Sequence, residues 1–226
     1  AYVGLSDSLT LQIEHAGAQE EVNLARADAA VATALELDPN LAEAWAASAL
    51  VRSFRGQGDR ADPLYRRAIA LNPNYAAAYQ RFSRNAGGIG HRDEALTAAE
   101  KAVELDPLSA IVNADLGRAL VSVGRFDEAA DRFRKANEID PEMPMPYRQA
   151  GVLDAYARNR FADAVPLMQR AAALDPDNPL LEFFRARLYF DLGDDVAATR
   201  VIEAARKRWP DNGAVLMVSA EMHMYR

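Results

Sequence analysis

Six prolines divide the sequence into units of nearly constant length. Successive members of this set are 34 residues apart, except for one interval of 35 residues between Pro141 and Pro176. Proline has no amide donor and disfavours the α conformation in the residue before it, so each of these positions ends a helix. A fixed period of this length predicts a stack of repeated supersecondary units. The six are Pro39, Pro73, Pro107, Pro141, Pro176 and Pro210.

Two alanines recur at fixed distances before these prolines. Seven residues separate the two, which is about two helical turns, so both lie on one face of a helix. Their small side chains let a neighbouring helix approach closely. The pairs are Ala27 and Ala34, Ala61 and Ala68, Ala95 and Ala102, Ala129 and Ala136, Ala164 and Ala171, and Ala198 and Ala205.

The other half of each unit carries a second small position, followed by a turn. Between the halves stand segments such as Gly-Arg-Phe-Asp-Glu-Ala at 124–129, in which glycine can close one helix and aspartate can cap the next. An alanine-rich chain with 8% aromatic residues also favours packed helices over sheet. Each unit is therefore predicted to be helix, turn, helix. The small positions are Ala49, Ser83, Gly117, Gly151, Ala186 and Ala220.

This pattern resembles the tetratricopeptide repeat family. The unit at 111–143 fits that family's consensus best, and the resemblance implies an all-α, right-handed superhelical solenoid of antiparallel helix pairs. We expect about six repeats plus one extra helix, or about thirteen helices, in a single solenoid over 1–226. The matching residues are Leu116, Gly117, Leu120, Gly124, Phe126, Ala129, Phe133, Ala136 and Pro141. The expected repeats are 1–41, 42–75, 76–109, 110–143, 144–178 and 179–212, with a terminal helix at 213–226.

The two ends of the array are incomplete in this interpretation. The first helix begins at the third residue of a repeat, and a turn with about nine extra residues follows it at roughly 14–19. The segment at 213–226 supplies only the first helix of a further unit, and the chain has no initiator methionine. We therefore expect the sequence to be a segment of a longer protein.

A few residues depart from the family's pattern. Charged residues stand at two positions where the family has an aromatic residue, and at two core positions of the sixth repeat. A proline also falls early in a second helix. These residues predict lower regularity in the sixth repeat and in the turn at 56–63. They are Arg52, Asp154, Glu182, Arg185 and Pro63.

The resemblance also implies a binding groove. In the family the first helices of the repeats line a concave face, and in this chain their inward positions are rich in arginine and aromatic residues. Arginine offers a planar fork to carboxylates, and aromatic rings anchor apolar groups. The alternative interpretation is solvated arginine together with phenylalanine that packs between helices. The predicted groove residues are Gln80, Arg81, Arg84, Asp115, Arg118, Arg148, Gln149, Tyr156, Phe183, Arg187 and Phe190.

The predicted function is a non-catalytic scaffold that binds a protein or peptide segment, with acidic segments preferred. One alternative is a regulatory or oligomerisation arm of a bacterial signalling or transcription regulator, and self-association through the array ends stays open. RNA recognition by helical repeats is a third class. It is disfavoured because the net charge of -7 argues against a nucleic-acid partner.

We expect no catalytic residues, no metal site and no cofactor. The chain has no cysteine, and the three histidines lack the spacing of known metal motifs, so we interpret them as surface residues. The glycine-rich stretch at 87–90 is interpreted as a turn because no lysine and serine follow it. No apolar run is long enough to span a bilayer. We expect a cytoplasmic location, with the periplasm as the alternative for a segment of a membrane-anchored protein. The histidines are His15, His91 and His223.

Overall fold

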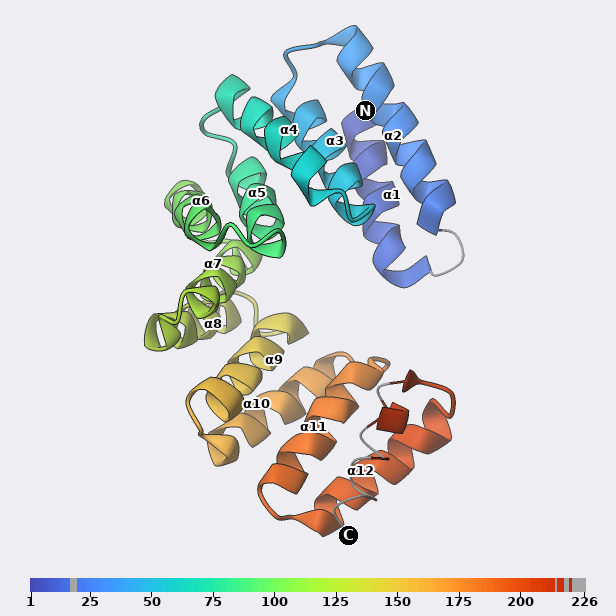
Figure 1. The fold of residues 1–226 in the computed structure, drawn as a ribbon, viewed down its shortest axis with the longest axis vertical. Coiled ribbons are helices and arrows are strands. Elements are labelled where there is room, and N and C mark those ends of the chain that lie inside the picture. The colour runs from blue at the N-terminus through green and yellow to red at the C-terminus, as the bar shows by residue number, and fades with distance from the viewer. Residues whose placement is uncertain (17–19, 214, 218–219, 221–226) are drawn as a thin grey trace. The chain divides into compact units, whose positions relative to one another are not determined.

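The computed structural model describes residues 1–16, 20–213, 215–217 and 220, and within these residues it contains helices and no strand (Figure 1). Thirteen helical elements span them, twelve of them α-helices and one a short π-helix, η2. The terminal helix expected at 213–226 lies largely outside the described residues. The elements are α1 Tyr2–Ala16, α2 Glu20–Leu37, α3 Ala42–Phe54, α4 Gly58–Leu71, α5 Ala76–Gly88, α6 Arg92–Leu105, α7 Ala110–Ser122, α8 Phe126–Ile139, α9 Pro144–Val152, η2 Leu153–Ala157, α10 Phe161–Leu174, α11 Pro179–Asp191 and α12 Asp195–Arg208.

The helices form two compact units, Ala1–Leu108 and Ser109–Arg226. In the first unit α1 packs on α2, α3 on α4 and α5 on α6, and each second helix also contacts the next first helix. In the second unit the pairs are α7 with α8, α9 with α10 and α11 with α12. Short turns join the members of these pairs, as expected for antiparallel helix hairpins. The helix, turn, helix prediction is confirmed.

The twelve recurring alanines lie at the helix contacts. Every one of them is at most 5% exposed. A side chain larger than alanine would push the crossing helices apart, so the alanine positions limit how each hairpin closes. Gly117 likewise lets α7 approach α8 closely, because a Cβ atom there would lie 2.6 Å from the ring of Phe133 on α8. Ala220 differs from the other small positions, since it is exposed.

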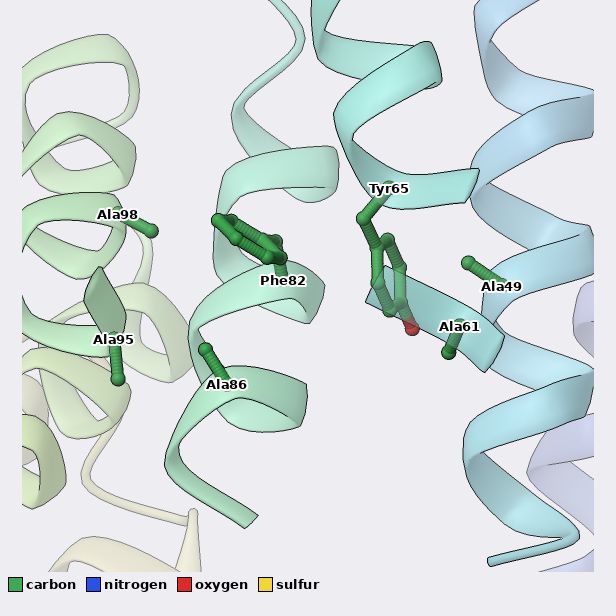
Figure 2. Close-up of a cluster of buried hydrophobic side chains, with 7 residues drawn as sticks. All are labelled: Ala49, Ala61, Tyr65, Phe82, Ala86, Ala95 and Ala98. Atoms are coloured by element: carbon green, nitrogen blue, oxygen red, sulfur yellow. The ribbon is translucent and has the colours of Figure 1, made fainter. Parts of the chain in front are cut away.

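Larger side chains fill the space between the alanines. In the first unit, a buried cluster combines residues of α3, α4, α5 and α6 around Tyr65 and Phe82 (Figure 2). The ring centroids of these two residues are 6.3 Å apart. The same cluster includes Ala49, Ala61 and Ala95, so small and large residues interlock across three helix contacts.

The extra residue of the fifth repeat is absorbed by a π-helix. The 35-residue interval from Pro141 to Pro176 contains η2, which continues α9 and ends at a turn through Asn159. One residue inserted into an α-helix winds it locally into a π turn. Asn159 has a φ of 55°, in the left-handed region that glycine occupies in four other turns of the described residues. The local irregularity therefore lies in the fifth repeat.

The irregularity expected in the sixth repeat and around Pro63 is not observed. Helix α4 is continuous although Pro63 lies inside it, and α11 is continuous as well. In α11, Arg185 donates a hydrogen bond to Glu182 at 2.8 Å, so the two charged residues at core positions neutralise each other. The prediction for the sixth repeat was wrong because it treated each charged residue as if it stood alone, and the prediction around Pro63 was wrong because α4 continues through that proline.

The charged residues at the family's aromatic positions also form ion pairs. Arg52 on α3 and Arg55, the residue that follows α3, both donate to the carboxylate of Asp28 on α2, at 2.7 and 2.6 Å. Burial raises the pKa of Asp28, but the hydrogen bonds from the two arginines outweigh it and lower that pKa overall. Asp154 in η2 accepts a hydrogen bond from Arg158 at 2.7 Å.

Candidate functional site

The predicted groove residues of the first unit lie on α5 and differ in accessibility. Gln80 is buried. Arg81 forms an ion pair with Asp7 of α1, with a distance of 3.1 Å between Nη1 and Oδ1. Arg84 is exposed, one turn further along the helix. Arg84 is therefore the residue of these three that offers its charge to solvent.

The predicted residues of α7 form a pair of their own. Asp115 is only 3% exposed, and its Oδ1 lies 3.0 Å from Nη2 of Arg118. The side chain of Arg118 is 40% exposed. The guanidinium of Arg118 thus neutralises a buried carboxylate and still reaches the surface of the helix.

Arg148 on α9 has a different environment. It is half-buried, and burial alone lowers the pKa of its guanidinium. No hydrogen bond or ion pair joins it to any residue that the structure describes. Most other arginines of the second unit, such as Arg158 and Arg170, are held by acidic side chains. A partly desolvated cation without an acidic neighbour is a ready site for a carboxylate.

The π-helix brings Tyr156 to α11. Tyr156 is exposed, and its hydroxyl donates to Oδ2 of Asp191 at 3.3 Å. Arg187 donates from Nε to the same carboxylate, at 3.2 Å to Oδ1. These three residues therefore form one polar cluster that joins η2 to α11. Gln149 is half-buried on α9.

The two predicted phenylalanines pack against the core of the last hairpin. Phe183 and Phe190 are half-buried and lie against a cluster formed by Ala186, Ala198 and residues of α12. The ring of Phe183 also meets Phe184 edge to face, with the centroids 5.3 Å apart. The alternative interpretation, in which these rings pack between helices, accounts for both phenylalanines. Their contact with a ligand stays a prediction.

One group of residues was missed by reasoning from the sequence. Asp62 of α4 approaches His91 and Glu94, which stand at the start of α6, and the three offer ligand atoms within 4.8 Å of one another. His91 and Glu94 are three residues apart and thus within reach on one helical turn. Asp62 is far from them in sequence, so only the packing of successive hairpins reveals the group.

None of the helices in the described part of the chain combines the length and the apolar character needed to span a bilayer. The predicted location in the cytoplasm or periplasm therefore stays a prediction.

Two family models described as tetratricopeptide repeat match the chain, one over residues 155–222 and the other over residues 81–144. No curated protein matches it.

Solved structures share the fold at low sequence identity. The structure of pilF from Pseudomonas aeruginosa is 21% identical with a TM-score of 0.72, and the alignment covers 97% of this chain and 99% of that chain. PilW, a type IV pilus biogenesis factor, is 20% identical with a TM-score of 0.79, over 94% of this chain and 97% of that one. YrrB, a tetratricopeptide repeat protein with an unusual peptide-binding site, is 19% identical with a TM-score of 0.60, over 84% and 97%. These similarities establish the fold.

Proposed function

The chain belongs to the tetratricopeptide repeat family, and from this premise we propose that it is a non-catalytic scaffold that binds a partner segment on the first helices of its repeats. The fold supports this role, because stacked hairpins expose a row of parallel helices to an extended peptide. YrrB, which has the same fold, carries a peptide-binding site. The proposed ligand is a protein segment with a carboxylate group.

The observation that carries this proposal is the environment of Arg148. Partial burial of a charge is costly unless an opposite charge offsets it, and Arg148 has no acidic partner among the described residues. A carboxylate of a bound peptide would supply that partner and accept two hydrogen bonds from the guanidinium. An arginine that already forms ion pairs with acidic side chains of the protein would gain little binding free energy from such a ligand.

A binding experiment with a matched control tests the proposal. The full chain would be used to select peptides from a library that varies both side-chain and C-terminal carboxylates. The affinity of the selected peptides would then be measured by fluorescence polarisation. Arg148→Gln should weaken binding about tenfold or more, because it removes a charge-assisted hydrogen bond. Arg134→Gln, on the second helix α8, serves as the control and should bind normally.

Two outcomes would contradict the proposal. One is equal affinity in Arg148→Gln and the natural chain, and the other is a set of selected peptides with no excess of acidic groups. Circular dichroism of each variant would show that the helices are intact.

Arg84 allows an independent test in the first unit. Arg84→Glu reverses an exposed charge and should repel an acidic segment that binds α5. Arg118→Glu is less suitable, because it would place a second carboxylate beside the buried Asp115. Normal binding by Arg84→Glu would confine the proposed site to the second unit.

No observation on the described residues favours the regulatory or oligomerisation arm over the scaffold, and that alternative stays a prediction.

A further inference from the structure

Three side chains with metal-ligating chemistry meet between α4 and α6 in the first unit. They are Asp62, His91 and Glu94, and their ligand atoms lie within 4.8 Å of one another. The shortest contact between the last two joins Nδ1 of His91 to Oε2 of Glu94, at 3.8 Å. Two carboxylates and an imidazole form a mixed oxygen and nitrogen donor set, which suits Zn²⁺ and similar cations better than Mg²⁺ or Ca²⁺.

Asp62 is incompletely satisfied in this group. Its Oδ2 accepts a hydrogen bond from Nε of Arg66 at 2.7 Å. Its Oδ1 is buried and has no hydrogen-bond partner among the described residues. A buried carboxylate oxygen without a donor is costly, so the Asp62 carboxylate would gain from a cation that it can reach.

The other two ligands have room to move. The side chains of His91 and Glu94 are 53% and 48% exposed. Around a tetrahedral Zn²⁺ with bonds of about 2.0 to 2.2 Å, neighbouring ligand atoms stand about 3.4 Å apart. The three atoms, at most 4.8 Å apart, must therefore draw together by up to about 1.4 Å, which the exposed side chains of His91 and Glu94 achieve by small rotations.

Arg66 is the main competitor for the site. Its Nη2 lies 2.6 Å from Oε2 of Glu94, and its guanidinium stacks on the ring of Phe82 at 4.9 Å. A metal ion must share Glu94 with this guanidinium or displace it. Removal of the Arg66 charge should therefore strengthen metal binding, while the rest of the cluster stays in place.

We propose that Asp62, His91 and Glu94 bind a divalent transition-metal cation, with Zn²⁺ as the best match. The site lies on second helices and is separate from the proposed peptide surface. It would link two successive hairpins, since Asp62 belongs to α4 and Glu94 to α6. Metal binding would then stabilise the contact between these hairpins.

Co²⁺ is the most informative probe, because its visible absorption reports ligand type and geometry. The full chain titrated with Co²⁺ should develop the intense visible band of a tetrahedral site, and Zn²⁺ should abolish this band. Asp62→Asn, His91→Ala and Glu94→Gln should each weaken Co²⁺ binding at least tenfold. Asp131→Asn, which removes an exposed carboxylate of α8, should leave the titration unchanged. Circular dichroism would show that each variant keeps its helices.

Arg66→Met keeps an aliphatic side chain on Phe82 and removes the competing charge, so it should bind Co²⁺ more tightly than the natural chain does. Absence of a visible band in the natural chain at millimolar Co²⁺ would overturn the proposal, even if Arg66→Met binds the ion. Unchanged binding in Asp62→Asn together with His91→Ala would overturn it as well, because the ion would then reside elsewhere.

Discussion

At some positions in this chain, the space left by a neighbouring helix decides how large the side chain can be. Gly117 and Phe133 illustrate this, because a ring 2.6 Å from the place of a Cβ atom leaves no room for one. Gly88 ends α5, and a Cβ atom there would meet nothing within 4 Å. The two helical glycines thus have different reasons to be glycine. The first is required by packing, and the second only lowers helix propensity.

We predict opposite effects of alanine at these two glycines. Gly117→Ala should destabilise the protein by about 1 to 3 kcal/mol, since overpacking forces Phe133 out of its position. Gly88→Ala should be neutral or stabilising by up to about 1 kcal/mol, because alanine restricts the unfolded chain. Urea denaturation followed by circular dichroism measures both free energies of unfolding. A Gly117→Ala variant as stable as the natural chain would show that the Phe133 ring can move aside without cost.

Ion pairs, as well as contacts between alanines, hold pairs of helices together in this chain. Arg52 of α3 and Arg55, which follows it, both meet Asp28 of α2, and the Asp28 side chain is 30% exposed. These ion pairs explain why Arg52 replaces an aromatic residue without a break in the helix. The same logic applies to Asp154 and Arg158 beside the π turn.

The contact between α2 and α3 should depend on pH. The hydrogen bonds from Arg55 and Arg52 hold the pKa of Asp28 below its unfolded value of about 3.9 despite the opposing effect of burial. A lowered pKa in the folded state stabilises the protein above the unfolded value, and this contribution is lost as the pH falls through the folded pKa. At neutral pH, Asp28→Asn should therefore be less stable than the natural chain by about 1 kcal/mol.

Thermal unfolding at a series of pH values measures this difference. The gap between Asp28→Asn and the natural chain should narrow below about pH 4. A gap that stays constant down to pH 2 would mean that Asp28 stabilises the contact by its shape and not by its charge.

At the scale of the whole molecule, stability in repeat arrays is nearly a sum over neighbouring units. Each hairpin of this chain contacts the next through its second helix within a unit, as α4 contacts α5 and α8 contacts α9. The effect of a local defect should therefore decrease with distance along the chain.

Hydrogen exchange of the Gly117→Ala variant tests this expectation. Amides of α7 and α8 should exchange faster than in the natural chain, and amides of α1 and α2 should keep their protection. Equal acceleration in all helices would contradict the additive view and indicate one cooperative unfolding unit.

The periodicity of the sequence is enough to specify the repeat and its helices. The recurring alanines and the proline positions are local signals that appear in every repeat. Each repeat therefore specifies the same helix hairpin independently of the neighbouring repeats. Burial of all twelve alanines follows from that periodicity. The interval of 35 residues also marked the fifth repeat as different, but spacing alone does not say that a π turn at Leu153–Ala157 takes up the extra residue.

Which charged residues form ion pairs and which stay available to a ligand depends on how the repeats pack on one another. The repeat pattern predicts that Arg81 and Arg148 both lie on the inward face of a first helix. In the structure Arg81 pairs with Asp7 of α1, whereas Arg148 meets no acidic side chain among the described residues. Asp62 likewise meets His91 and Glu94 only through the packing of α4 near α6. The physical reason is that periodicity encodes contacts within a repeat, whereas ion pairs and ligand groups join side chains from different repeats.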